Sequence, residues 1–232
     1  MAPTPDLTAF KALSFDCYGT LVDWETCALT TLAPLLTQLP ASHAYAADPG
    51  AAVARFDDLS NAQQVSHPTQ LHSVNLALSY RALAAELGLA ATDADADAAA
   101  AAPGVCAAFP DTAPALAVLA RRYKLVLLSN VDRKNIGAAL ATGGLAEAPA
   151  FAAVYTAQDV GCYKPSHDNF AFLAARARAE LGIDAGAGEL LHVARSRKPP
   201  LGFLSVLWDG SGGQRRVSLP DPCPPACRVG RG

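Results

Sequence analysis

Short, uninterrupted apolar runs predict four β-strands in this chain. They lie at residues 12–15, 124–128, 151–156 and 189–193. Apolar residues that follow one another without polar alternation are typical of strands covered on both faces, as in parallel sheets. The pattern therefore favours a sheet buried between layers of helices.

Helical spacing separates the later predicted strands. Asp111 or Thr112 begins a helix that is expected to run to about Tyr123. A second helix is predicted from near Asp168 to a stop at Gly182. Strands that alternate with helices predict an α/β fold with a doubly wound parallel sheet. In such sheets the binding crevice lies beyond the carboxyl ends of the strands.

More than a hundred residues separate the first two predicted strands, which is too many for a single crossover. Residues 24–88 show mostly helical spacing, with a helix that ends at Gly88, and they predict an inserted cap domain. The alanine-rich residues 90–103 are expected to form a mobile return linker without a functional role.

The predicted organisation has three parts. They are a core made of residues 1–22 and 104–196, a helical cap with its return linker at 23–103, and an atypical tail at 197–232. The tail is rich in Gly, Arg and Pro, and its last twenty residues are expected not to pack. Residues 201–209 have a composition that suits a last edge strand.

Composition narrows the functional classes. The 232 residues carry a formal net charge of −3 and only 17% are charged, so no basic field is available to bind nucleic acid. No apolar run approaches the ~20 residues that span a bilayer, and the N-terminal stretch lacks a signal-peptide apolar region. We expect a cytoplasmic protein whose partner is a small-molecule substrate, with neither nucleic acid nor membrane, and which is able to form a homodimer.

The metal-ligating residue types are scattered. Six cysteines are expected to be free thiols rather than disulfides or a zinc site: Cys17, Cys27, Cys106, Cys162, Cys223 and Cys227. The five histidines have no ligand spacing and are expected to be structural: His43, His67, His72, His167 and His192. The sequence therefore predicts neither a metal nor a cofactor.

The candidate catalytic and anion-binding residues lie at or near the ends of the predicted strands. Asp16 follows the first strand, where a carboxylate can act as a nucleophile. Thr20 offers a hydroxyl to orient it, and Lys164 would hold it in its charged form. Ser129 and Asn130 follow the second strand and supply neutral donors for a bound anion, although they could also be a simple helix cap.

Three motifs stand at these strand ends. They are Ser-Phe-Asp-Cys-Tyr-Gly-Thr-Leu-Val-Asp at 14–23, Leu-Leu-Ser-Asn-Val at 127–131, and Tyr-Thr-Ala-Gln-Asp-Val-Gly-Cys-Tyr-Lys-Pro at 155–165. In this order, they resemble the haloacid dehalogenase (HAD) superfamily of hydrolases, and specifically its type II 2-haloacid dehalogenase branch. The resemblance covers about residues 11–194 and implies a Rossmann-like core with a cap.

The resemblance also implies a reaction. Superfamily phosphatases usually carry a second aspartate two residues after the nucleophile, to protonate the leaving group, and bind magnesium nearby. Here that position is Tyr18, which would instead wall an apolar pocket. Halide needs no proton when it leaves. Asp16 would therefore displace halide from a short 2-haloacid, and water would hydrolyse the resulting ester to a 2-hydroxyacid without metal.

The chain departs from the branch at three places. No Lys or Arg stands between the nucleophile and Arg55, which would have to replace the halide-binding arginine of the cap. Phe170 replaces a tyrosine that helps to hold the site, and the acidic part of the final motif is missing after Ser196. The expected catalytic residues are Asp16, Thr20, Ser129 and Lys164, and the expected substrate-binding residues are Tyr18, Asn130, Arg55 and Ser196.

Some alternatives stay open. Asp159 either pairs with Lys164 or caps a turn, and Asp23 and Trp24 are expected to serve the cap hinge and its packing. The chain could also be a catalytically impaired relative that only binds a small anion or a partner. A small-molecule ester or phosphate hydrolase is a further alternative, which Tyr18 disfavours.

Overall fold

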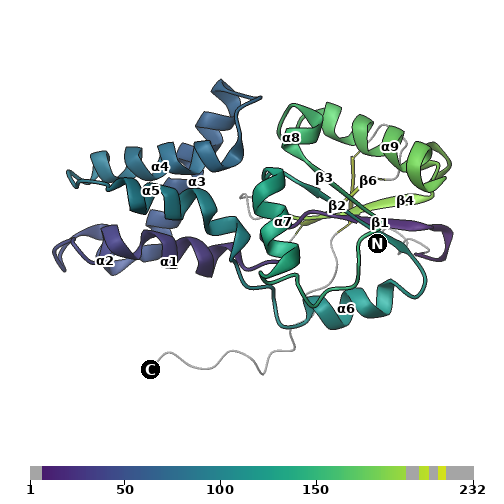
Figure 1. Cartoon of the computed structure of the whole chain (residues 1–232), viewed down its shortest axis with the longest axis horizontal. Helices are drawn as coiled ribbons and strands as arrows, with labels where there is room; N and C mark the ends of the chain where they lie inside the picture. The colour runs from purple at the N-terminus through teal and green to yellow at the C-terminus, as the bar shows by residue number, and fades with distance from the viewer. Residues whose placement is uncertain (1–6, 197–203, 209–213, 218–232) are drawn as a thin grey trace.

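A parallel sheet forms the core of the protein. The computed structural model describes residues 7–196, 204–208 and 214–217. Four parallel strands are arranged in the order β3-β2-β1-β4 (Figure 1), as the apolar runs predict. Their bounds are Ala12–Phe15 for β1, Lys124–Ser129 for β2, Ala153–Thr156 for β3 and Leu190–Val193 for β4. Ala12 lies opposite both Lys124 and Leu190, so the carboxyl ends of three neighbouring strands meet at one edge.

Helices cover both faces of the sheet (Figure 1). Their bounds are Thr112–Leu119 for α6, Arg133–Ala141 for α7, Ala157–Val160 for α8 and His167–Leu181 for α9. Because side chains alternate along a strand, Leu13 of β1 packs in one cluster with Leu116 of α6 and Ile136 of α7. Ala12 packs on the other face with Leu173 of α9. The α/β core is therefore confirmed.

The predicted helix ends are partly correct. Helix α9 stops at Gly182, whose φ of 67° is the left-handed conformation that glycine adopts readily. Helix α6 ends at Leu119, earlier than the expected Tyr123. Turns at residues 120–123 complete the connection, because they lead the chain into β2.

Five helices form the cap, which lies beside the sheet in Figure 1. Their bounds are Trp24–Leu36 for α1, Ala44–Ala47 for α2, Pro49–Ser66 for α3, His72–Glu86 for α4 and Asp93–Ala101 for α5. The cap has its own hydrophobic core, in which Leu32, Phe56 and Tyr80 are fully buried. The described residues also contain three short 3₁₀ helices: η1 Leu7–Ala9, η2 Ala102–Gly104 and η3 Ala185–Ala187.

The expected mobile linker at residues 90–103 is wrong, because most of it forms helix α5. Thr92 and Asp95 cap the helix reciprocally: the Asp95 backbone N–H donates to Thr92 Oγ1 at 3.1 Å, and the Asp95 carboxylate accepts from the Thr92 backbone. Ala96 and Ala99 are buried in the cap. Alanine has the highest helix propensity, and its small side chain lets α5 pack against α4.

Two chain segments connect the cap to the core, and they lie side by side. Val22 in the outgoing segment forms an antiparallel bridge with Ala108 in the returning one. The backbone N–H of Asp23 donates to the carbonyl of Ala107 at 2.9 Å. The two connections therefore form a short paired hinge rather than two independent linkers.

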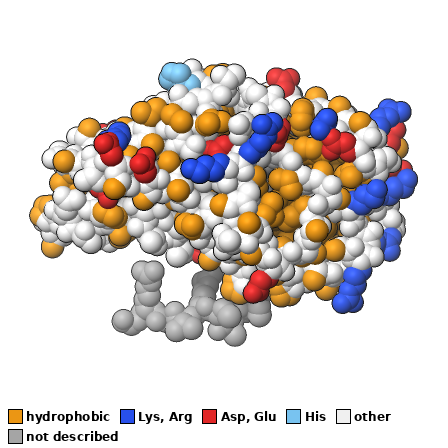
Figure 2. All heavy atoms as spheres, viewed as in Figure 1, with side chains coloured by type: hydrophobic (Ala, Val, Ile, Leu, Met, Phe, Trp, Pro, Cys, Tyr) orange, Lys and Arg blue, Asp and Glu red, His pale blue; other side chains and the backbone are white. Residues whose placement is uncertain are grey.

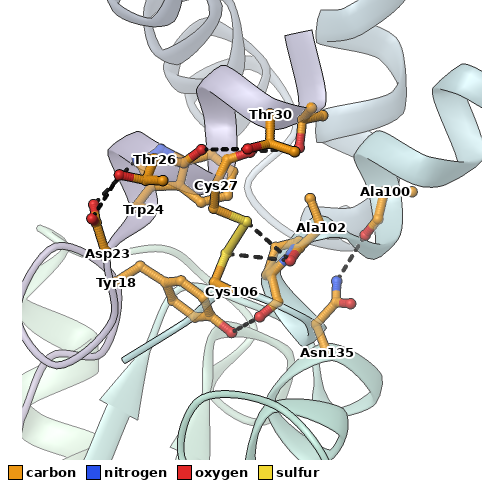
Figure 3. The surroundings of a disulfide bond; sticks show 12 residues. Tyr18, Asp23, Trp24, Thr26, Cys27, Thr30, Ala100, Ala102, Cys106 and Asn135 are labelled. Carbon is orange, nitrogen blue, oxygen red and sulfur yellow. Dashed lines mark hydrogen bonds between the residues drawn. A yellow bond between two sulfur atoms is a disulfide. The ribbon is translucent and has the colours of Figure 1, made fainter. Parts of the chain in front are cut away.

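A disulfide between Cys27 and Cys106 crosses this hinge (Figure 3). It joins helix α1 to the segment after η2, and its sulfur atoms lie 3.4 and 3.3 Å from the carbonyl oxygen of Ala102. The prediction of free thiols is therefore wrong for this pair, which is separated by 79 residues in sequence. Cys17 and Cys162 are free, as expected. The two cysteines at 223 and 227 lie outside the described residues.

The described parts of the tail form strands. Strands β5 (Arg195–Ser196), β6 (Leu204–Trp208) and β7 (Gln214–Val217) form a separate antiparallel sheet in the order β5-β6-β7. The strand predicted within 201–209 is thus present, but it pairs with β5 and β7 rather than extending the parallel sheet. The expectation that the last twenty residues do not pack is wrong for 214–217, because β7 pairs with β6. Residues 218–232 lie outside the description.

The surface agrees with the low charge content of the chain. On the face shown in Figure 2, Lys and Arg side chains gather mainly over the core, while scattered apolar side chains cover much of the cap. Within the described residues, no helix combines the length and the apolar character that a membrane span requires.

We expect the disulfide to stabilise the protein against unfolding. Cys27→Ser should lower the free energy of unfolding by roughly 2–4 kcal/mol, because a cross-link that closes a long loop restricts the unfolded chain. Urea unfolding of the oxidised protein would measure the difference. Cys162→Ser is the matched control, since Cys162 is a free cysteine. Equal stability of Cys27→Ser and wild type, with every cysteine open to alkylation, would contradict the cross-link.

Candidate active site

An ion pair lies at the carboxyl edge of the parallel sheet. Lys164 Nζ is 2.6 Å from Asp16 Oδ1, and both side chains are mostly buried, with 13% and 20% of their surface exposed. The same ammonium donates to the carbonyl of Leu128 at 2.6 Å. Asp16 is fixed in turn by its backbone N–H, which donates to Val193 of β4 at 2.9 Å. The two residues predicted as nucleophile and activating lysine are therefore in direct contact.

The turn after β1 brings a second polar group to Asp16. Thr20 Oγ1 donates to Asp16 Oδ2 over 3.4 Å and accepts the backbone N–H of Arg195 at 3.0 Å. Gly19 has a φ of 82°, which favours glycine at this position. The structure thus brings Thr20 to Asp16, as the motif predicts.

Asn130 has a different contact set from the one expected. Its Oδ1 accepts the backbone N–H of Lys164 at 2.8 Å, and its Nδ2 donates to the carbonyl of the same residue at 3.2 Å. This pair of bonds fixes the loop that carries Lys164. Asn130 lines the site, but its amide is used to position the lysine. Ser129 is buried beside it and its Oγ accepts the N–H of Val131 at 3.5 Å.

Tyr18 stands between core and cap. Its hydroxyl donates to the carbonyl of Pro103 at 2.7 Å, and its ring meets Trp24 edge-on at 6.2 Å between centroids. Burial raises the pKa of Tyr18, and the negative charges of neighbouring groups raise it further. The hydroxyl therefore stays protonated and is already committed to a backbone carbonyl.

A cavity of about 230 Å³ opens over Asp16 between the core and the cap. The core contributes the ends of β1 and β2, and the cap contributes one face of α3 and the start of α4. Its lining residues are Asp16, Tyr18, Trp24, Asp57, Ser60, Asn61, Gln64, His72, Leu76, Pro103, Ser129, Asn130 and Val131. A second cavity of about 310 Å³ shares Tyr18, Trp24 and Asp57 with it.

Sequence reasoning missed most of the cap side of this cavity. Trp24 was expected to pack and His72 to be structural, yet both line the cavity. Asp57, Asn61 and Gln64 were not singled out at all. Their spacing along α3 places them on one helical face, but only the position of the cap shows that this face meets the active site.

Arg55 does not replace the missing arginine. It forms a two-pronged ion pair with Glu86 on the cap surface, at 2.9 and 2.5 Å, and it is not among the residues that line the cavity. The expectation is wrong because the face of α3 that carries Arg55 turns toward α4 instead. The side chain of Ser196 lies outside the described residues.

The structure decides between the two alternatives for Asp159. Its carboxylate accepts from Thr156 at the start of α8, at 2.8 Å from the backbone N–H, and pairs with Arg133 at 2.5 Å. Both of its partners lie away from Lys164, so it caps a turn. Its pKa is lowered: the hydrogen bonds from Thr156 and Arg133 outweigh the opposing effect of burial.

A buried polar pair lies under the reacting groups. His192 Nδ1 is 3.1 Å from Ser14 Oγ, and Phe170, where the branch has a tyrosine, packs edge-on against the imidazole at 5.3 Å between centroids. Burial and, to a lesser extent, the positive charge of Lys164 lower the pKa of His192 to about 3. His192 is therefore a neutral structural residue, in agreement with the sequence.

The described residues offer no metal site. They contain no group of three or more His, Cys, Asp and Glu side chains that could hold an ion. The family phosphatases have a carboxylate two residues after the nucleophile, and here Tyr18 occupies that place. The donor set therefore does not fit a magnesium ion.

The sequence as a whole matches a known family. A sequence model of haloacid dehalogenase-like hydrolases matches residues 10–189. The chain belongs to this family. The match includes the nucleophile motif, the entire cap and the lysine motif, and it ends just before β4. A search of curated proteins found no significant match.

Solved structures show that this hydrolase shares the dehalogenase fold. The L-2-haloacid dehalogenase from Xanthobacter autotrophicus has a TM-score of 0.63 and 24% identity, over 79% of this chain and 69% of that chain. Another L-2-haloacid dehalogenase gives 0.64 and 23%, over 80% and 76%. A HAD-hydrolase from Bacillus subtilis, bound to magnesium, gives 0.59 and 15%, over 81% and 80%. At these identities the similarity concerns the fold.

We expect the free energy of unfolding to fall as the pH is lowered, because His192 is buried in its neutral form. Below its ordinary pKa of 6.5, the unfolded chain takes up a proton that the folded protein refuses until about pH 3. The free energy of unfolding should therefore drop as the pH falls below 6.5, by up to about 1.4 kcal/mol per pH unit for this group. His192→Gln should flatten this slope, and the exposed His67→Gln should not. Parallel slopes for wild type and His192→Gln would contradict a neutral buried imidazole.

Proposed function

We propose that this HAD-like hydrolase removes halide from a short 2-haloacid through an ester formed on Asp16. The observation that carries the proposal is the state of Tyr18. When a phosphate ester is hydrolysed, its alcohol part would leave as an alkoxide and needs a proton from a general acid. Halide leaves without a proton. Tyr18 stands where the acid would be, with its hydroxyl bound to Pro103 and its pKa raised.

The first step is a displacement at C2 of the haloacid. A carboxylate oxygen of Asp16 forms a bond to C2, the carbon–halogen bond breaks, and the halide leaves with the electron pair. Lys164 and Thr20 contact the two oxygens of Asp16 at 2.6 and 3.4 Å and hold the carboxylate in place. Holding the nucleophile in an attacking geometry lowers the entropic part of the barrier.

The second step is hydrolysis of the ester. Water attacks the carbonyl carbon of Asp16, and the bond between this carbon and the ester oxygen breaks. That oxygen, which came from Asp16, leaves as the hydroxyl of the 2-hydroxyacid and takes one proton of the water. The other proton goes to solvent, and Asp16 is restored as a carboxylate. Negative charge develops on the carbonyl oxygen in the tetrahedral intermediate. Each oxygen of Asp16 has its own donor, Lys164 at Oδ1 and Thr20 at Oδ2. The oxygen that remains the carbonyl is therefore stabilised by a donor that needs no reorganisation, and attack through Oδ2 leaves Oδ1 with the ammonium of Lys164.

The structural neighbours support this assignment. The Xanthobacter autotrophicus enzyme has also been solved with chloropropionic acid covalently bound, as an ester mechanism requires of an intermediate. One observation favours a second candidate, a relative that binds a small anion without turnover. Among the described residues that line the cavity, none is Lys or Arg, so the halide has no cationic partner from the cap.

Halide release decides between the two. Wild type should release halide from one enantiomer of 2-chloropropionate and from monohaloacetates, equally with EDTA and with magnesium. Asp16→Asn should abolish release. Lys164→Met should lower kcat by about 10²–10³-fold, the usual cost of losing an oxyanion partner.

Arg55→Met is the matched control for Lys164→Met, because it removes a cation that lies outside the cavity. It should leave kcat unchanged. If folded wild type releases no halide from any of these haloacids, the dehalogenase proposal is wrong and the binding protein is favoured. Magnesium-dependent phosphate release that requires Asp16 would favour a phosphatase instead.

A further inference from the structure

One face of α3 forms the cap wall of the cavity. Asp57, Ser60, Asn61 and Gln64 all line it, and their spacing of three, four and seven residues places them along one side of the helix. We call these four residues the α3 polar face. Since a helix rises 1.5 Å per residue, the polar face extends over about 10 Å, which is the length of a small ligand.

The α3 polar face begins at the reacting end of the cavity. Gln64 Oε1 accepts from Asn130 at 3.4 Å, and Gln64 Nε2 donates to Ser60 Oγ at 3.4 Å. At the far end, the indole of Trp24 donates to Asp57 Oδ1 at 3.0 Å. A ligand held at Asp16 that extends toward the cap therefore meets amide, hydroxyl and carboxylate groups in succession.

The charge of the cap is strongly negative. Residues 23–103 contain nine Asp or Glu and only two Lys or Arg. Both cations are paired on the surface, Arg55 with Glu86 and Arg81 with Asp93, at 2.5 Å each. A second carboxylate on a substrate would therefore approach like charge.

The other charged side chains around Asp57 do not remove this excess of negative charge. Burial raises the pKa of Asp57, the hydrogen bond from Trp24 opposes this, and the negative charge of Asp58, its neighbour on α3, raises the pKa further. Asp23, Glu25 and Arg195 surround the adjoining cavity that shares Asp57. Acidic side chains thus outnumber the single described cation on that side as well.

The volume of the cavity and the polarity of its cap wall limit which substituent a bound 2-haloacid can carry. At roughly 30 Å³ per water molecule, the cavity of about 230 Å³ holds about eight waters, which corresponds to an acid of a few carbons. An alkyl group would leave buried Ser60 facing apolar surface. A site that offers hydrogen bonds discriminates against an analogue that cannot make them.

We propose that the α3 polar face selects substrates whose substituent beyond the reacting carbon carries a hydroxyl or a similar uncharged hydrogen-bonding group, and no second negative charge. The inference rests on the proposed function, because it specifies the substituent of the 2-haloacid that Asp16 attacks. The substrate class is a short hydroxylated 2-haloacid rather than an alkyl 2-haloacid or a halogenated diacid.

An isosteric pair of substrates tests the selection. In 2-chloro-3-hydroxypropionate a hydroxyl replaces the terminal methyl of 2-chlorobutyrate, so the two differ in hydrogen bonding and hardly in size. We expect kcat/KM for halide release to be about tenfold higher for the hydroxylated acid, as two net hydrogen bonds would give. The diacid 2-chlorosuccinate should fall about tenfold or more below 2-chlorobutyrate. Blanks without enzyme correct for spontaneous halide loss.

Substitutions on α3 should move these ratios separately. The double variant Ser60→Ala/Asn61→Leu should bring the hydroxyl-to-methyl ratio close to one. Asp57→Asn keeps an acceptor for Trp24 but removes the charge, so it should raise kcat/KM for 2-chlorosuccinate relative to 2-chlorobutyrate. Asp58→Asn is the matched control: it removes the same charge from the adjacent, exposed position that does not line the cavity, and should leave both ratios unchanged.

A binding measurement separates this inference from the proposed function. The Asp16→Asn protein should bind glycerate about tenfold more tightly than the isosteric 2-hydroxybutyrate, by calorimetry, whether or not wild type turns over. If no haloacid releases halide, the proposed function fails, and this affinity ratio alone decides the inference. Equal affinities, or a higher kcat/KM for 2-chlorobutyrate, would overturn the selection by the α3 polar face.

Discussion

The ion pair between Lys164 and Asp16 is the constraint on which the arrangement of the site depends. The two residues are 148 positions apart in sequence, and they meet because the parallel register brings the ends of β1 and β3 to the same edge. The loop that carries the lysine is fixed by Asn130, and the ammonium also bonds to Leu128. A buried charge without its partner is costly, so the pair couples folding of the core to the placement of Asp16 and Lys164 at one edge of the sheet.

Several links join the cap to the part of the core that carries this pair. It has its own hydrophobic core, and its two connections to the sheet pair with each other and are joined by the disulfide of Cys27 and Cys106. Tyr18 adds a third link, because its ring belongs to the core and its hydroxyl bonds to Pro103 at the end of the cap. The cavity over Asp16 thus lies between two parts of the chain that are linked at several points.

The sequence predicted what depends on local pattern. Apolar runs located all four parallel strands, and the motifs located Asp16 and Lys164, because strand ends of a parallel sheet converge whatever the loops do. Prediction from the sequence failed for features that depend on packing between segments far apart in the chain. The alanine-rich segment was mistaken for a linker although its composition favours a helix, and the bond between Cys27 and Cys106 required the hinge to be known. Arg55 was assigned from its charge alone, without the orientation of α3.

The charges of the site explain why the cap wall matters so much. Lys164 and Asp16 neutralise each other, so an incoming carboxylate finds no net positive charge among the described lining residues. Affinity must then come from directed hydrogen bonds and from fit. Such contacts discriminate by shape and by the presence of donors, which a diffuse positive field cannot do. In this chain the groups available for that purpose are concentrated on α3, from Gln64, which bonds to Asn130, to Asp57, which accepts from Trp24. The proposed specificity therefore rests on the cap, and the proposed chemistry rests on the sheet.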